Sequence, residues 1–197
     1  MGRPREFEIE RAIDKATDLF WRNGYDRTSV HDLTKEIGIT APSFYFAFGN
    51  KEGLFKKVIE RYFVEQSKAF EAACREPTAH AVAARLLYGY ADLLTDSAHA
   101  PGCLAMNSAL PCAADTPIRA WLADLREQLR VRLRDRFAYA KTARDLPKAA
   151  NPDALARLVT MTAWGMAVDA QAGVRREDLH KAVATVLENW PRTNEPT

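Results

Sequence analysis

This chain of 197 residues has no long apolar run, few cysteines and a small net charge. No stretch approaches the roughly 20 consecutive apolar residues that a membrane-spanning helix needs. The opening residues, MGRPREFEIER, also lack the apolar core of a signal peptide. We therefore expect a cytoplasmic protein that has no membrane partner.

The three cysteines, Cys74, Cys103 and Cys112, are an odd number in a chain without a recognisable secretion signal. This pattern is typical of reduced thiols and not of a disulfide framework. The cysteines and the four histidines show no metal-ligand spacing either. The sequence predicts no metal site, and we expect no cofactor.

Net charge and the spacing of apolar residues further limit the class of protein to which the chain can belong. The formal net charge is only +2, so long-range attraction to nucleic acid is weak, and DNA binding would have to come from a few local cations and amides. Alternating polar and apolar residues, the pattern of a half-buried strand, are missing, whereas helical spacing recurs throughout. We predict an all-α protein with a small N-terminal domain and a larger helical C-terminal domain.

What the sequence does contain is a compact set of helix signals early in the chain. Ser29 and Asp32 have the spacing of a capping box, and Gly38 can adopt the left-handed backbone that ends a helix and reverses the chain. Thr40 can cap a second helix, whose first turn holds Pro42. Two short helices joined by a tight turn are typical of a helix-turn-helix that reads DNA, although a helical hairpin inside a core would share these signals.

The second short helix has two unlike sides. Phe44 and Phe48 share one side and are expected to pack inward. The other side carries short polar groups and aromatic rings, which suit a groove floor and a phosphate rim. Lys51 opens the following helix, where a cation and the free amides of a helix start favour a phosphate.

The first sixty residues or so resemble the DNA-binding domain of the TetR/AcrR family of transcriptional regulators. The resemblance rests on many fixed spacings, carried by Ala16, Phe20, Gly24-Tyr25, Thr28-Ser29-Val30, Leu33, Gly38-Ile39-Thr40, Pro42-Ser43-Phe44-Tyr45, Phe48, Gly49-Asn50-Lys51-Glu52 and Leu54-Phe55. Ala41 and Ala47 depart from the basic or histidine side chains of many relatives, and Phe46 replaces a commoner polar aromatic residue. These departures leave fewer polar groups for base contacts.

The resemblance implies a one-component regulator, most often a repressor, that binds an inverted-repeat operator as a homodimer and is released by a small-molecule effector. Pattern and resemblance together predict a set of DNA-binding residues: Thr28, Ser29, Thr40, Ala41, Pro42, Ser43, Tyr45, Phe46 and Lys51. No enzyme activity is expected. A cysteine hydrolase built on Cys103 with His99 or His80 would lack a third orienting residue and a glycine-rich oxyanion turn.

Prolines and caps divide the chain into segments. We expect a helix-turn-helix domain over 1–49, a connecting helix over 50–76, a ligand-binding and dimerisation domain over 77–190, and a polar tail over 191–197. Beyond the two short helices, the expected helices cover 8–23, 50–74, 79–96, 103–110, 116–139, 151–172 and 176–190. Small residues such as Ala163, Gly165 and Ala182 suit a close helix pair, which the resemblance assigns to the dimer interface. The alternative is that they complete one subunit's core.

Aromatic and flexible apolar side chains in the C-terminal half are of the kind that enclose a small organic effector. The candidates are Leu87, Tyr90, Leu94, Met106, Trp121, Leu125, Met161 and Trp164. The alternative for each of them is an ordinary position in a helical core.

Cys103 supports a different mode of regulation. It follows Pro101-Gly102 and is predicted to open a helix, where free amides and the helix dipole favour a reactive thiolate. One alternative function is therefore a redox-sensing or electrophile-sensing repressor, and a packed small residue is the competing interpretation of this cysteine. Another alternative is a module that binds DNA without sequence preference, or binds a protein.

Overall fold

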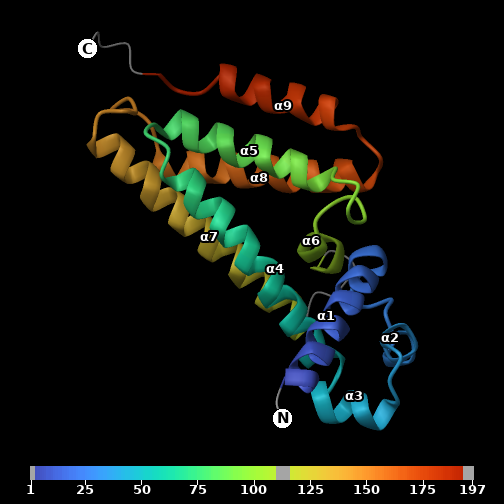
Figure 1. Ribbon diagram of the computed structural model, residues 1–197. Helices are drawn as coiled ribbons and strands as arrows, with labels where there is room; N and C mark the ends of the chain where they lie inside the picture. The colour runs from blue at the N-terminus through green and yellow to red at the C-terminus, as the bar shows by residue number, and fades with distance from the viewer. Residues whose placement is uncertain (1–2, 110–115, 193–197) are drawn as a thin grey trace. The chain divides into compact units, whose positions relative to one another are not determined.

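The computed structural model describes residues 3–109 and 116–192, and all regular structure within those ranges is α-helical. Figure 1 shows the helices, which are α1 (Arg3–Asn23), α2 (Val30–Ile37), α3 (Ala41–Phe48), α4 (Lys51–Cys74), α5 (Ala79–Leu94), α6 (Leu104–Ala109), α7 (Pro117–Thr142), α8 (Pro152–Gln171) and α9 (Arg176–Glu188). The expected all-α class is confirmed. Within the described ranges, no helix has the length and apolar character needed to cross a membrane.

The expected helices are all present, and their ends differ by a few residues. The first helix begins at Arg3, before the expected residue 8, and α7 runs past Tyr139 to Thr142. The last helix stops at Glu188. The expected end of the short sixth helix, at 110, lies outside the described residues, as does Cys112.

Contacts group the chain into two compact units that do not follow the linear order of the sequence. The first unit combines residues 1–66 with 97–122, and the second combines 67–96 with 123–197. Residues 97–109 and 116–122 therefore group with the N-terminal helices, whereas the sequence placed them in the C-terminal domain. Helices α4 and α7 each contribute residues to both units.

Aromatic rings form the centre of the first unit. The rings of Phe20 in α1 and Phe55 in α4 meet edge to face with centroids 5.0 Å apart, and Tyr25 lies 4.8 Å from Phe55. Phe20, Leu33 and Phe44 have no exposed surface. The ring cluster joins α1 to the start of α4, and α2 and α3 each bury a side chain, Leu33 and Phe44, in the same unit.

The end of α1 is attached to the segment that contains α6. The Trp21 indole N–H donates to the Gly102 carbonyl at 3.1 Å, and the Asn107 amide donates to the Trp21 carbonyl at 3.4 Å. The His99 ring stacks on Trp21 with centroids 3.9 Å apart. These contacts explain why residues 97–109 belong to the first unit.

In the second unit, α5 packs against α8 and α9. One polar cluster links α5 to α9: Arg176 Nε and His180 Nε2 lie 2.6 Å and 2.7 Å from the same carboxylate oxygen of Asp92. Burial acts to raise the pKa of Asp92, but the hydrogen bonds from Arg176 and His180 outweigh it, so that this pKa is lowered from its ordinary value of 3.8.

Gly24 has a positive φ of 77°, and a Cβ added there would lie 2.9 Å from the Asn107 carbonyl oxygen. We expect Gly24→Ala to lower the free energy of unfolding by about 1 to 3 kcal/mol, because the substitution combines backbone strain with a clash against main chain. The measurement is chemical denaturation. Gly89→Ala, within α5 and with nothing near the added Cβ, should be neutral or stabilising. Equal effects of the two substitutions would contradict the expected strain at Gly24.

Asp92→Asn should destabilise the protein at neutral pH by less than about 1 kcal/mol, because these side chains are partly exposed. Since the folded-state pKa of Asp92 is lowered, its contribution is complete well above pH 3.8 and is lost as the pH falls below that value. The difference in stability between the two proteins should therefore shrink as the pH falls below 3.8. Denaturation curves at pH 7, 4 and 3 test this, and a constant difference across them would contradict it.

Candidate DNA-binding surface

The first short helix, α2, is closed at both ends by the residues that the sequence indicated. The Ser29 hydroxyl accepts from the Asp32 amide at 3.1 Å, and the Asp32 carboxylate accepts from the Ser29 amide at 3.0 Å, which completes the capping box. Hydrogen bonds from the Ser29 hydroxyl and amide lower the pKa of Asp32. Gly38 has left-handed φ and ψ of 83° and 36° and ends the helix. The predicted capping box and turn are confirmed.

The second short helix, α3, begins at its predicted cap and buries its predicted side. Thr40 Oγ1 accepts from the Ser43 amide at 3.4 Å, and Pro42 lies in the first turn. Phe44 and Phe48 are buried, with ring centroids 5.5 Å apart. The two phenylalanines therefore hold α3 against the rest of the first unit.

The opposite side of α3 is exposed. Tyr45 and Phe46 are 51% and 78% exposed, which is unusual for aromatic rings. The exposed side chains from the predicted set are Ser29, Thr40, Ala41, Pro42, Ser43, Tyr45 and Phe46. The arrangement combines small hydroxyl groups, which can bond to base edges or phosphates, with aromatic rings that can contact sugars and thymine methyl groups.

Two residues of the predicted DNA-binding set, Thr28 and Lys51, are not among the exposed ones. Thr28 has no exposed surface, and its hydroxyl donates to the Gly24 carbonyl at 2.7 Å, so this side chain stabilises the connection between α1 and α2. The Lys51 ammonium donates to the Tyr25 carbonyl at 3.0 Å and lies 4.2 Å from the centre of the Tyr25 ring. An ammonium has three N–H donors, so Lys51 retains donors for a phosphate.

A hollow of about 940 Å³ lies beside α3. Its lining comes from α1, the turn between α2 and α3, and α3 itself, and consists of Glu8, Ile9, Arg11, Ala12, Lys15, Ile37, Gly38, Ile39, Pro42, Ser43, Phe46, Ala47 and Phe48. Sequence reasoning missed Arg11 and Lys15 as cations next to the exposed side of α3. Their spacing of four residues is the signal that would have shown them on one face of α1.

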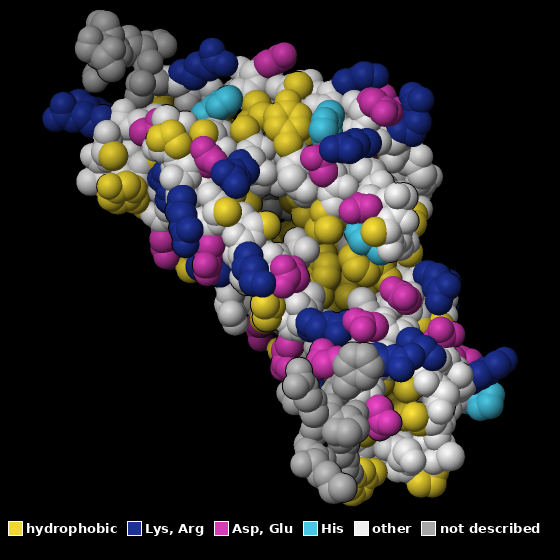
Figure 2. All heavy atoms as spheres, viewed as in Figure 1, with side chains coloured by type: hydrophobic (Ala, Val, Ile, Leu, Met, Phe, Trp, Pro, Cys, Tyr) yellow, Lys and Arg dark blue, Asp and Glu magenta, His cyan; other side chains and the backbone are white. Residues whose placement is uncertain are grey.

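Charge on the visible face of the molecule is mixed. Figure 2 shows Lys and Arg side chains interspersed with Asp and Glu, which agrees with a formal net charge of +2. DNA binding by such a surface depends on local geometry more than on a general basic field.

The candidate effector residues are distributed over both units. Leu87 and Leu94 are fully buried and Met106 is nearly so, whereas Tyr90, Trp121, Leu125 and Trp164 are partly exposed. Met161 is 65% exposed on α8. Within the second unit, the Arg126 guanidinium lies 5.3 Å from the Trp164 ring. The structure thus places Leu87 and Leu94 in the core, and Met161 on the surface.

Cys103 is only 4% exposed, and its sulfur lies 3.4 Å from the Tyr62 hydroxyl. The two cysteines in the described ranges, Cys74 and Cys103, are both free. His99 stacks on Trp21, and His80 belongs to the other unit. The burial of Cys103 favours a packed residue over a thiol that is open to oxidants.

Two capped short helices, a tight turn and an exposed polar and aromatic face on the second helix define the class of helix-turn-helix DNA-binding proteins. Comparisons with known proteins agree. Residues 12–58 match the family described as bacterial regulatory proteins, tetR family. The chain is 32% identical over 193 residues to the HTH-type transcriptional repressor ComR of Escherichia coli, covering 96% of this chain and 92% of ComR. It is also 49% identical over 61 residues to the repressor BdcR of Escherichia coli, 31% of each chain.

Solved structures resemble this chain over most of its length. A cysteine mutant of the TetR family regulator CifR, complexed with 26-bp operator DNA, superposes with a TM-score of 0.86 at 30% identity, covering 91% of this chain and 95% of that one. A putative TetR regulator from a Rhodococcus species has 38% identity and a TM-score of 0.65 and covers 92% and 98%. The chain belongs to the TetR family of transcriptional regulators. It is a regulator and not an enzyme, as expected.

Proposed function

We propose that the protein is a repressor that binds a double-stranded, inverted-repeat operator as a homodimer and leaves it when a small-molecule effector binds. The observation that carries this proposal is the exposed face of α3, which is fixed from behind by buried Phe44 and Phe48. The similarity to the repressor ComR, and to CifR in its complex with operator DNA, supports it.

The side chains on α3 suggest a division of roles in the DNA complex. Thr40 and Ser43 are short and lie at the N-terminal end of the helix, the end that approaches base edges in helix-turn-helix proteins. Tyr45 and Lys51 are longer, and we assign them to phosphates. The hydroxyls of Thr40 and Ser43 lie 3.0 Å apart, so one can orient the other toward a base.

A stripe on α8 supports the homodimer. Ala154, Leu158, Met161, Gly165 and Val168 are all exposed, and they follow one another at intervals of four and three residues. This is the spacing of a helix seam, and Leu158, Met161 and Val168 are large apolar side chains 42%, 65% and 47% exposed. A second copy of the chain would bury them. Two recognition helices about 34 Å apart would then meet successive major grooves.

The effector is assigned to the second unit, where the partly exposed Tyr90, Leu125 and Trp164 supply apolar and aromatic surface. Release requires only that the effector bind more tightly to the conformation in which the two DNA-binding units of the dimer no longer match the operator. The difference in binding free energy is typically about 1 to 3 kcal/mol. Helix α4 is the suggested transmitter, because it contributes residues to both units.

The test of this function is a selection of genomic DNA fragments by the purified protein at a fixed salt concentration, followed by footprinting of the best fragment. The expected result is a symmetric protected site with two half-sites. Uniform recovery of all fragments, or none, would contradict a sequence-specific operator and favour the interaction-module alternative.

Lys51→Met should weaken binding to operator and to random DNA by similar factors, because an interaction with phosphate carries no sequence information. The slope of log K against log salt should become shallower by about 1 for each phosphate that the variant no longer neutralises. Lys56→Met is the matched control, since Lys56 pairs with Glu52 at 2.7 Å. An unchanged salt slope in Lys51→Met would limit Lys51 to its interaction with Tyr25.

Met161→Lys should convert the dimer into monomers, because it places a charge in the middle of the α8 stripe. Sedimentation velocity would show the change in mass, and operator affinity should fall by about a hundredfold or more because a monomer binds only one half-site. Ala69→Lys introduces the same charge at an exposed position on α4 and should leave the mass unchanged. A Met161→Lys variant that remained dimeric would place the interface elsewhere.

A further inference from the structure

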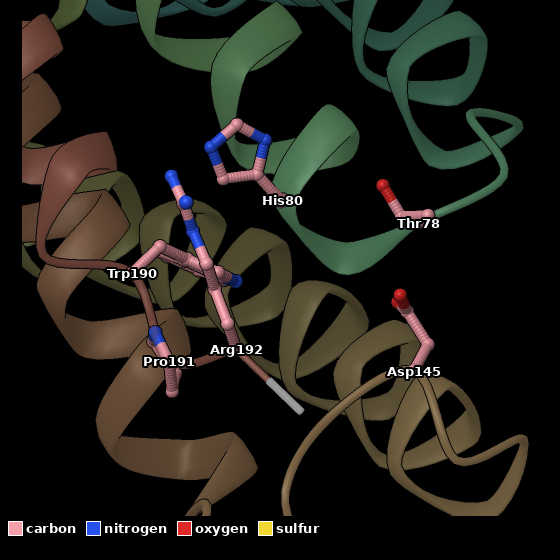
Figure 3. A pocket seen from close by; sticks show the side chains of 6 residues that line it. All are labelled: Thr78, His80, Asp145, Trp190, Pro191 and Arg192. Atoms are coloured by element: carbon pink, nitrogen blue, oxygen red, sulfur yellow. The ribbon is translucent and has the colours of Figure 1, made fainter. Parts of the chain in front are cut away.

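A small hollow opens in the second unit at the start of α5. Its volume is about 270 Å³. Figure 3 shows the six residues that line it: Thr78, His80, Asp145, Trp190, Pro191 and Arg192. They come from three separate parts of the chain, namely the start of α5, the connection after α7 and the segment after α9.

Each of these parts is held by contacts of its own. Thr78 caps α5 by accepting from the Ala81 amide at 3.1 Å. Arg144 has a left-handed φ of 63°, which turns the chain after α7 and allows the Asp145 carboxylate to accept from the Ala79 amide at 2.5 Å. The Trp190 ring packs edge to face on Phe137, with centroids 5.4 Å apart.

Hydrogen-bond donors at this hollow lack partners. Trp190 is only 4% exposed, and its indole N–H has no acceptor among the described residues. A buried N–H without an acceptor is costly, so this donor favours a ligand that supplies one. In the described ranges, His80 and Arg192 likewise have no hydrogen bond or ion pair, and in Figure 3 the Arg192 side chain extends toward the His80 ring.

Charge at the hollow is divided between its two sides. Arg192 provides a permanent cation, and His80 and Trp190 add donors, so that this side suits a carboxylate. Asp145 provides the opposite charge beside Thr78, which suits an ammonium group. A simple anion would gain the first set of contacts but would be repelled by Asp145.

We propose that this hollow is a binding site for a small zwitterion of the free amino acid class. The carboxylate of the ligand meets Arg192, His80 and the Trp190 N–H, and its ammonium group meets Asp145. The volume of about 270 Å³ lies below the range for drug-sized ligands, which agrees with a molecule of this size. The site shares no residue with the DNA-binding surface, the α8 stripe or the candidate effector residues.

The experiment is a titration of the ¹⁵N-labelled full chain with glycine, followed through the indole N–H signals of its four tryptophans. Trp190→Phe identifies the Trp190 signal. Acetate and methylammonium, which each carry half of the zwitterion's charges, are the matched probes. We expect the Trp190 signal to shift and saturate with glycine, and each half-ligand to bind at least about tenfold more weakly.

Variants separate the site from a nonspecific effect. Arg192→Ala and Asp145→Asn should each weaken glycine binding by about tenfold or more. Asp145→Asn keeps an oxygen that can accept from the Ala79 amide, so the helix cap is preserved. Lys148→Ala removes an exposed cation that does not line the hollow and should change nothing.

Three results would overturn the proposal. They are no selective response of the Trp190 signal up to about 50 mM glycine, an unchanged response in Arg192→Ala, and a response to acetate as strong as that to glycine. The last result would assign the hollow to simple anions.

Discussion

The proposed DNA-binding face, which is the exposed side of α3, depends on the stabilisation of two helices that are too short to be stable alone. Helices α2 and α3 have eight residues each, well under the length at which an isolated helix persists in water. Their N-terminal ends are capped by Ser29 with Asp32 and by Thr40, and burial of Leu33 in α2 and of Phe44 and Phe48 in α3 adds to the stabilisation. Because α3 uses its large apolar side chains for that packing, its other side is free to carry hydroxyls and exposed rings.

The first unit contains more of the chain than the helix-turn-helix motif and its neighbouring helices. Trp21 donates a hydrogen bond to Gly102 and stacks on His99. A segment from the middle of the chain therefore completes the unit that contains α3. Any conformational change that reaches residues 97–109 therefore acts directly on the end of α1. The segment 97–109 is thus a connection to the DNA-binding helices in addition to α4. It is made by the ring stacking of Trp21 on His99 and by two hydrogen bonds.

Local signals predicted much of the fold. The capping box at Ser29, the left-handed Gly38 and the proline-marked starts of α7 and α8 were all legible, because each depends on residues within one turn of each other. Solvent exposure was harder to predict. Thr28 belongs to the family pattern, yet it is buried and its hydroxyl donates to the Gly24 carbonyl. Met161 is a flexible apolar residue of the kind that lines pockets, but it lies on the surface.

The sequence by itself determined the helical class, the position of the helix-turn-helix and the family, since these follow from short-range spacing. Tertiary structure alone decided that residues 97–109 join the first unit, that Lys51 contacts Tyr25, and that Thr78, Asp145 and Trp190 meet at one hollow. The physical reason is that such contacts join residues from 26 to over 100 positions apart. Which distant side chains meet is set by how whole helices pack, and no local pattern encodes that.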